Sequence, residues 1–290
     1  MATVLITGTS SGIGFATALA FARGGHRVAA TMRNPARSPE LARVAGAEGL
    51  SVTVSEVDVD SDSSVHEGIA RIVEEVGPID VLVNNAGIER TGSVEELPLA
   101  EFRAVMETNY FGVIRCIQAV LPSMRTRRRG TIVNVASIAG RLASSPFAPY
   151  AASKHALEAL SECLAQEVKA YDVRVAIIEP GIIDTPMAQH LGTFDSAGSP
   201  SPYSHQRRMA ALFTESLKTP TPPTLVAEKI LEVATTDTRQ LRHPVGPDAA
   251  PFLDWRKAMS DEAWIEWGAL PDDAWYDRVE AEFGLKAKPS

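Results

Sequence analysis

The sequence contains little that would suggest secretion, membrane insertion or a cysteine-based site. Its two cysteines, Cys116 and Cys163, are too few for a disulfide framework, which indicates a reducing compartment. No apolar run approaches the roughly 18 residues of a membrane span. A strand pattern that begins at Thr3 leaves no space for a secretory signal. We therefore expect a cytoplasmic protein with no membrane partner.

Positive charge is also scarce. The chain has 28 Lys and Arg against 36 Asp and Glu, a formal net charge of -8. This balance argues against a nucleic-acid partner, because binding to phosphate backbones needs a basic face. The four arginines between positions 125 and 129 are interpreted as a solvated helix end, and the six histidines follow no metal-ligand spacing. We predict a small-molecule substrate and no metal site.

Short β-branched runs alternate with longer helical patterns along most of the chain. Continuous apolar runs are typical of parallel strands that are buried on both faces. The pattern therefore predicts an α/β fold with a doubly wound parallel sheet of about seven strands, Rossmann-type, and helices on both faces. The predicted strands are 3–6, 27–32, 52–57, 80–83, 131–135, 173–178 and 241–245.

The helical patterns and the tail complete a single predicted domain over residues 1–290. Helices are expected at 65–76, 100–126, 150–171 and 224–234. Residues 186–223, rich in Ser and Pro, are interpreted as a mobile substrate flap. Residues 251–290 form a C-terminal extension that holds all four tryptophans. This extension covers either the substrate pocket or a neighbouring subunit.

A glycine-rich turn joins the first strand to the first helix. Glycines let the backbone approach a pyrophosphate, and the amides at a helix N-terminus favour its negative charge. The turn predicts a phosphate-binding site at Gly8, Ser10, Ser11, Gly12, Ile13 and Gly14.

The glycine spacing, with three residues between Gly8 and Gly12, resembles the short-chain dehydrogenase/reductase family, in its compact single-domain branch. Two further segments agree with that family, and the resemblance covers roughly residues 3–185. It implies that Asp58 and Val59 contact the adenine, and that the segment with Asn85, Ala86 and Gly87 stabilises the strands beside the cofactor. It also implies an NAD(P)-dependent oxidoreductase.

The end of the second strand indicates which cofactor is used. An acidic residue that would grip the ribose 2′-hydroxyl is expected there, but the position holds Met32. Its neighbour Arg33 offers a planar donor fork that suits a 2′-phosphate, and Arg37 offers a second contact. We therefore predict NADP(H) as the cofactor.

Three side chains are expected to carry the chemistry. Tyr150 and Lys154 are four residues apart in a helical pattern and so lie on one face. The Lys154 ammonium is expected to lower the pKa of Tyr150, which then moves the substrate proton, and also to hold the nicotinamide ribose. Ser137 ends the fifth strand, where open sheets place their ligands, and is expected to bind the substrate oxygen.

The resemblance adds further positions. Asn109 matches the fourth catalytic residue of the family, which takes part in a proton relay through the lysine, and as a weak helix former it suits a kinked helix. Pro180, Gly181, Ile183 and Thr185 match the segment that backs the nicotinamide. A homodimer or homotetramer is implied by the resemblance alone.

The expected pocket wall includes Ile88, Ser145, Phe147 and Met187 and is mostly apolar. It favours a hydrophobic substrate, alicyclic, aromatic or steroid-like, whose carbonyl and secondary alcohol forms are interconverted as in a ketoreductase. An acidic substrate also stays open as an alternative, because the flap contains basic and polar residues. Two other functions also stay open, a non-catalytic NADP(H)-sensing or scaffold protein and a sugar-nucleotide epimerase-like enzyme.

Overall fold

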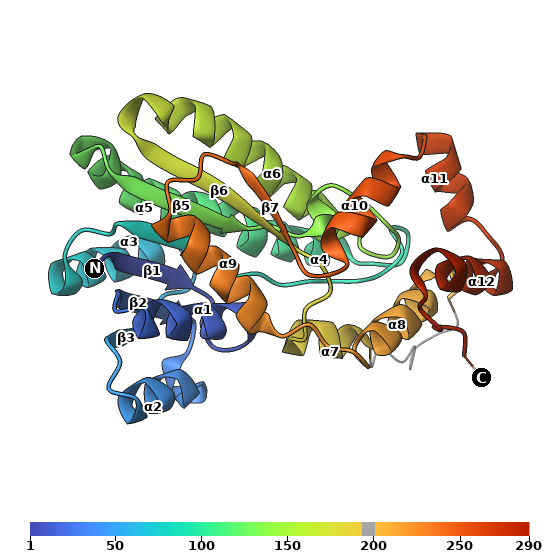
Figure 1. Ribbon diagram of the computed structural model, residues 1–290, viewed down its shortest axis with the longest axis horizontal. Helices are drawn as coiled ribbons and strands as arrows, with labels where there is room; N and C mark the ends of the chain where they lie inside the picture. The colour runs from blue at the N-terminus through green and yellow to red at the C-terminus, as the bar shows by residue number, and fades with distance from the viewer. Residues whose placement is uncertain (193–200, 290) are drawn as a thin grey trace.

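Seven parallel strands form a sheet through the middle of the protein (Figure 1). The computed structural model describes residues 1–192 and 201–289. The strand order is β3-β2-β1-β4-β5-β6-β7, and all neighbours pair in parallel. The predicted doubly wound α/β fold is confirmed. The strands are β1 (Thr3–Thr7), β2 (Arg27–Met32), β3 (Val52–Glu56), β4 (Val81–Asn84), β5 (Gly130–Val135), β6 (Val173–Pro180) and β7 (Arg242–Val245).

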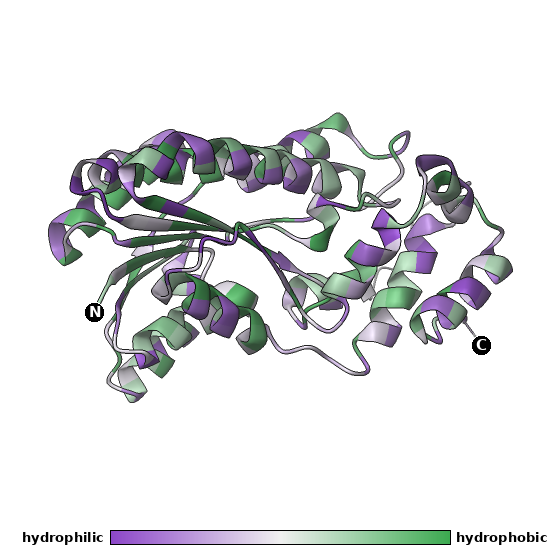
Figure 2. Ribbon diagram, turned by 45° about the horizontal axis from the view of Figure 1, so that its top comes forward, coloured by the Kyte–Doolittle hydropathy of each residue, from purple (hydrophilic) through white to green (hydrophobic). Residues whose placement is uncertain are grey.

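Helices cover both faces of this sheet, as Figure 2 shows. One face is covered by α1 (Gly12–Arg23), α2 (Glu40–Ala47) and α9 (Pro223–Thr235). The other face is covered by α3 (Asp62–Val76), α5 (Gly112–Arg127) and α6 (Ala148–Val168), with α4 (Leu99–Met106) packed against α6. Three short turns, η1 (Pro35–Arg37), η3 (Ile138–Gly140) and η4 (Lys169–Tyr171), connect these elements.

The apolar strand sequences follow from burial on both faces. Successive side chains of a strand point to opposite faces, so both sets must be apolar where helices cover both. In β1, Leu5 packs into the core beneath α3 and α5, whereas Val4 and Ile6 pack into the core beneath α1 and α9. All three are fully buried. The predicted strand boundaries agree with the structure to within about two residues.

The helix predicted over 100–126 is interrupted. Between α4 and α5 the backbone widens into a π-helical turn, η2 (Glu107–Phe111), which contains Asn109. A π-helical turn accommodates an extra residue and is frequent at functional sites. The helix is therefore interrupted at Asn109 by a π-helical turn, while the expected kink stays a prediction.

The C-terminal third contains helices that the sequence did not predict. The segment predicted as a flap holds α7 (Pro186–Gly192) and α8 (His205–Ser216), while residues 193–200 lie outside the described part. Its mobility stays a prediction. Beyond β7, three helices form what we call the C-terminal cap: α10 (Ala249–Lys257), α11 (Asp261–Gly268) and α12 (Asp272–Phe283). The cap and α8 share an apolar cluster of their own. Figure 1 shows α8 beside α12. Within the described ranges, no helix has the length and apolar character needed to cross a membrane.

Candidate functional site

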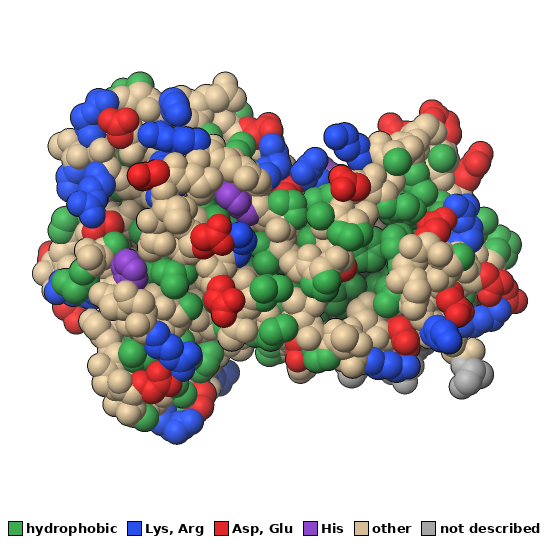
Figure 3. Space-filling model, in the orientation of Figure 1, with side chains coloured by type: hydrophobic (Ala, Val, Ile, Leu, Met, Phe, Trp, Pro, Cys, Tyr) green, Lys and Arg blue, Asp and Glu red, His purple; other side chains and the backbone are tan. Residues whose placement is uncertain are grey.

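A cavity of about 390 Å³ lies at the carboxyl ends of the central strands. Its wall begins at the glycine turn after β1, passes the ends of β4, β5 and β6, and finishes at α7, α8 and the C-terminal cap. In Figure 3, hydrophobic side chains gather where the sheet-bearing body meets the cap. Open α/β sheets bind their ligands at this edge, where the strand order reverses between β1 and β4.

The glycine turn is built for a close approach of backbone to ligand. Gly8 has φ +71°, and a Cβ there would lie 2.6 Å from the Cα of Ala86. A Cβ on Gly14 would collide with the carbonyl oxygen of Gly8. Asn85 fixes the turn, since its Nδ2 donates to the carbonyl oxygens of Thr7 and Gly8, each at 3.0 Å. The turn and the α1 N-terminus fit the pyrophosphate of a dinucleotide.

Most of the residues predicted to bind the cofactor line this cavity, including Arg33 and Val59, together with Met32. Two predictions need correction. Gly14 lies beneath the turn, where its role is to let α1 pack against Gly8. Asp58 does not line the cavity, and its Oδ1 accepts from the backbone N–H of Asp60 at 3.2 Å.

Asp60, which the sequence analysis did not select, is the acidic residue at the Arg33 end of the cavity. Its carboxylate accepts a hydrogen bond from the Thr108 hydroxyl at 3.0 Å. Burial raises its pKa, while that hydrogen bond and the charge of Arg33 lower it. The Arg33 guanidinium thus lies within electrostatic range of a carboxylate at the cavity wall.

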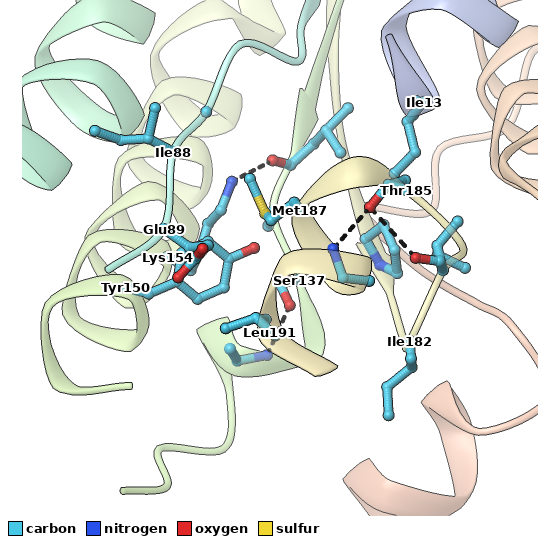
Figure 4. Close-up of a pocket in the computed structure, with 18 of the residues that line it drawn as sticks. Ile13, Ile88, Glu89, Ser137, Tyr150, Lys154, Ile182, Thr185, Met187 and Leu191 are labelled. Atoms are coloured by element: carbon cyan, nitrogen blue, oxygen red, sulfur yellow. Dashed lines mark hydrogen bonds between the residues drawn. The ribbon is translucent and has the colours of Figure 1, made fainter. Parts of the chain in front are cut away.

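Ser137, Tyr150 and Lys154 meet in the central part of the cavity (Figure 4). Tyr150 and Lys154 lie one turn apart on α6, and the Lys154 Nζ is 5.6 Å from the centre of the Tyr150 ring. The Lys154 ammonium donates to the carbonyl oxygen of Val135 at 2.9 Å, which fixes it beside the end of β5. Ser137 follows that strand, and its Oγ accepts from the N–H of Ala139 at 3.1 Å. The structure therefore brings the three predicted side chains together.

The electrostatics of this group differ from the expectation. Burial raises the pKa of Tyr150 to about 12, an effect that Ser137 opposes and the charge of Glu89 reinforces. Burial lowers the pKa of Lys154 to about 8, against the attraction of Glu158. Burial thus dominates the pKa of Tyr150, and the expected lowering by Lys154 is not found. With this raised pKa the Tyr150 hydroxyl keeps its proton at neutral pH.

Asn109 is fully buried and acts on the loop after β4. Its Oδ1 accepts from the Ile88 N–H at 2.9 Å, and its Nδ2 donates to the Ile88 carbonyl at 2.9 Å and to Ser153 Oγ at 3.0 Å. These bonds occupy the side chain behind the cavity wall. In this structure Asn109 positions Ile88 and does not itself face the cavity.

The segment after β6 lines the cavity as predicted, through Pro180, Gly181, Ile183 and Thr185. It is attached to the start of α10 by Asp248, whose Oδ2 accepts from the Ile182 N–H at 2.7 Å. A side chain at Gly181 would collide with the Asp248 carboxylate. The chain therefore needs glycine here to bring the segment and the cap together.

The outer part of the cavity is more aromatic than the sequence indicated. Ile88, Phe147 and Met187 line it as predicted. Ser145 does not line it: the residue is exposed and borders a separate hollow, while the neighbouring Pro146 and Phe147 are buried. Three tryptophans from the cap complete the wall, Trp255, Trp264 and Trp267. Of the two positions left open for the tail, the structure places it over the pocket.

The cap tryptophans pack on one another and on the body. The Trp264 and Trp267 rings stack with centres 5.5 Å apart, and Trp255 stands edge-on to both. Trp264 Nε1 donates to the carbonyl oxygen of Ala143 at 2.9 Å, which joins the cap to the loop after Ser137. The concentration of tryptophans in the tail was the sequence signal for this wall. In the chain that the structure describes, no cluster of His, Cys, Asp and Glu is arranged for a metal ion.

Comparisons with known proteins agree with this geometry. Residues 2–195 match the model of the short chain dehydrogenase family. Retinol dehydrogenase 8 of Bos taurus is 43% identical over 187 residues, 63% of this chain and 59% of that protein. A 3-ketodihydrosphingosine reductase of Bacteroides thetaiotaomicron is 33% identical over 245 residues, 84% of this chain and 87% of that protein.

Two solved structures share the fold. A short-chain dehydrogenase from Streptomyces avermitilis superposes with a TM-score of 0.76 at 30% identity, covering 97% of both chains. An alcohol dehydrogenase from Thermococcus sibiricus, solved with 5-hydroxy-NADP, superposes with a TM-score of 0.68 at 27% identity, covering 84% of this chain and 95% of that one.

Proposed function

Because the chain belongs to the short-chain dehydrogenase family, we propose that it is an NADP(H)-dependent oxidoreductase that interconverts a hydrophobic carbonyl compound and its secondary alcohol. The observation that carries the proposal is the single cavity that joins the glycine turn to Ser137, Tyr150 and Lys154. A dinucleotide site and a proton donor in one cavity are what hydride transfer to a carbonyl requires.

The preference for NADP(H) rests on the end of β2. Met32 and Arg33 both line the cavity there, where a carboxylate would be needed to bind a ribose 2′-hydroxyl. Burial raises the pKa of Asp60, the carboxylate at that end, and the positive charge of Arg33 opposes this rise. A guanidinium binds phosphate through paired, charge-assisted hydrogen bonds. The alcohol dehydrogenase of similar fold was solved with an NADP derivative, which is consistent with this proposal.

The bound nicotinamide would supply or accept the hydride, and the protein would supply the proton and the orientation. Ser137 and Tyr150 bind the substrate oxygen from the end of β5 and from α6, and so polarise the carbonyl. Tyr150 gives the proton of its hydroxyl to that oxygen, and the raised pKa keeps this proton in place until the carbonyl develops negative charge. Lys154, fixed by Val135, places a positive charge beside the phenolate that results.

The substrate is proposed to be largely hydrophobic. The outer cavity is walled by aliphatic side chains such as Ile88 and Met187 and by the three cap tryptophans. Apolar walls stabilise a ligand in proportion to the apolar area that they remove from water. The names of two relatives, a retinol dehydrogenase and a 3-ketodihydrosphingosine reductase, refer to hydrophobic substrates and support this class.

Two further parts of the proposal concern assembly and location. We propose a homo-oligomer, and the half-exposed Phe111 at the end of η2 offers an apolar contact for a second copy. We propose a cytoplasmic location, which the free thiols of Cys116 and Cys163 support. Size-exclusion chromatography with light scattering tests the assembly.

The central experiment compares binding and turnover. NADPH and NADH are titrated separately against nicotinamide fluorescence, and a panel of hydrophobic ketones is then screened for loss of nicotinamide absorbance. We expect tighter binding of NADPH and reduction of at least one ketone. Tyr150→Phe should retain binding and lose turnover by about 10²- to 10⁴-fold. The matched control is Tyr171→Phe on the exposed turn η4. If neither nucleotide binds, the proposed function is wrong.

A further inference from the structure

One carboxylate in the catalytic part of the cavity has no role in the chemistry above. Glu89 follows Ile88 on the loop after β4, is half-buried, and lines the cavity. Figure 4 shows it on the same side of the cavity as Tyr150 and Lys154. The other carboxylate of the cavity wall, Asp60, belongs to the Arg33 end and bonds Thr108. Among the residues that the structure describes, Glu89 is therefore the acidic group on the catalytic side of the cavity.

Glu89 also acts on the proton donor Tyr150 through its charge. Its charge raises the pKa of Tyr150, so the carboxylate is within effective range of the hydroxyl that binds the substrate oxygen. Burial raises the pKa of Glu89 itself, and the charges of His190 on α7 and of Arg90 lower it. A carboxylate on an apolar wall costs desolvation energy unless a donor or a cation faces it.

The positive charges near Glu89 offset the desolvation of its carboxylate only in part. The Arg90 guanidinium is directed to the Glu101 carboxylate, with Nε 2.6 Å from Oε2, and to the backbone carbonyl of Glu89 at 2.7 Å. His190 lies on α7, the helix that also bears Met187. The residue therefore carries a desolvation cost beside the reaction centre that a bound substrate can offset.

We propose that Glu89 selects substrates that carry a hydrogen-bond donor, a hydroxyl or an ammonium group, on the carbon next to the reacting carbonyl. This inference rests on the proposed function and narrows its substrate class. The carbonyl oxygen lies against Ser137 and Tyr150, the neighbouring donor faces Glu89, and the apolar remainder extends toward Trp255, Trp264 and Trp267. The substrate is thus amphipathic, with a polar end at the reaction centre.

A matched pair of ketones tests the donor directly. Kinetics with 1-hydroxy-2-decanone and 1-methoxy-2-decanone compare two substrates of similar size, of which only the first has a donor. We expect kcat/KM to be about 10-fold or more higher for the hydroxy ketone. Glu89→Leu should abolish this preference. Glu101→Gln is the matched control, because it removes a carboxylate near the same loop that does not line the cavity.

The nature of the donor is resolved by a second variant and a binding probe. Glu89→Gln keeps a hydrogen-bond acceptor but loses the charge. It should retain part of the hydroxyl preference and weaken the binding of decylamine by about 10-fold or more. Decylamine binding is followed by the fluorescence of the cap tryptophans and needs no turnover, so it tests Glu89 even if no ketone is reduced.

Two results overturn the inference. Equal kcat/KM for the two ketones in the wild-type protein would show that no donor is recognised. An equal loss of kcat for both ketones in Glu89→Leu, with unchanged decylamine binding, would show that Glu89 acts only on Tyr150. In either case, reduction of a ketone by the wild-type protein would still support the proposed function. Absence of NADPH binding would instead count against the proposed function.

Discussion

Lys154 and Glu158 lie one helical turn apart on the buried side of α6, and the Glu158 carboxylate opposes the loss of positive charge that burial imposes on Lys154. Glu158 is itself buried next to Glu179 at the end of β6. Arg242 bridges the two, with Nε 2.8 Å from Glu158 and 3.9 Å from Glu179. The lysine of the site thus has a buried acidic pair behind it.

This pair predicts a pH-dependent stability. Burial, reinforced by Glu179, raises the pKa of Glu158 from 4.5 to about 7. Between these values the unfolded chain has lost the proton and the folded chain keeps it, so stability falls as the pH rises. Glu158→Gln should remove a fall on the order of 2 kcal/mol, or about 5 °C in Tm. Thermal denaturation from pH 4 to 8 measures this slope.

The control for that slope is Glu162→Gln. Glu162 also bonds Arg242, at 2.7 Å, but its side chain is 49% exposed. It should keep the wild-type dependence of Tm on pH. Parallel slopes for Glu158→Gln and the wild-type protein would contradict the prediction.

Arg33→Ala should reduce the preference for the phosphorylated cofactor. Loss of a charged hydrogen-bond donor is expected to weaken NADPH binding by about 10- to 100-fold and NADH binding by less than about threefold. Fluorescence titration at constant ionic strength measures both. Arg37, which the sequence analysis offered as a second contact, lies on η1 and does not line the cavity, so Arg37→Ala is the control. Equal weakening of both nucleotides by Arg33→Ala would mean that the arginine does not contact the 2′-phosphate.

Gly14→Ala should destabilise the fold. The added methyl group collides with the Gly8 carbonyl and with Asn85, and overpacking of this kind costs about 1 to 3 kcal/mol. Gly46→Ala on α2 meets open space and should stabilise the helix by up to about 1 kcal/mol. Urea denaturation of the two variants distinguishes them, and a shift in the same direction for both would be unexpected.

Trp264→Phe should loosen the attachment of the cap while it keeps an aromatic ring at this position. The variant loses the hydrogen bond from Nε1 to Ala143 that fastens the cap to the loop after Ser137. We expect KM for long-chain ketones to rise several-fold, while kcat/KM for a small ring such as cyclohexanone stays the same. Steady-state kinetics on the two substrates provide the comparison. An equal effect on both would indicate a general disturbance of the site.

The body of the fold could be predicted from the sequence because its strands are buried on both faces and therefore appear as apolar runs. The same was true of the glycine turn and of the spacing between Tyr150 and Lys154. Roles that depend on packing were harder to foresee. Gly14 and Asn109 have the residue types expected for cofactor binding and catalysis. In the structure, however, Gly14 packs beneath the glycine turn and Asn109 bonds the loop after β4 from behind the cavity wall.

The helices of the cap and the burial of Glu89 could not be predicted from the local sequence pattern. The cap helices are short, and their apolar side chains meet partners distant in the sequence, such as Leu212 of α8. A glutamate in a loop is typical of a solvent-exposed position, and only the closing of the cavity makes it half-buried. The pKa of Tyr150 was misjudged for the same reason, since burial is a property of the assembled site.

The π-helical turn between α4 and α5 lets the helix meet two requirements, the direction of the Asn109 side chain and the packing of α5 on the sheet. Each residue of an α-helix advances the direction of its side chain by about 100°. Removing one residue from Glu107–Phe111 would therefore rotate α5 against α4 by about this angle and turn buried residues such as Cys116 and Val120 toward water. The extra residue thus changes the rotation of α5 relative to α4. The side chain of Asn109 can then point to the loop after β4 while α5 keeps its apolar residues against the sheet.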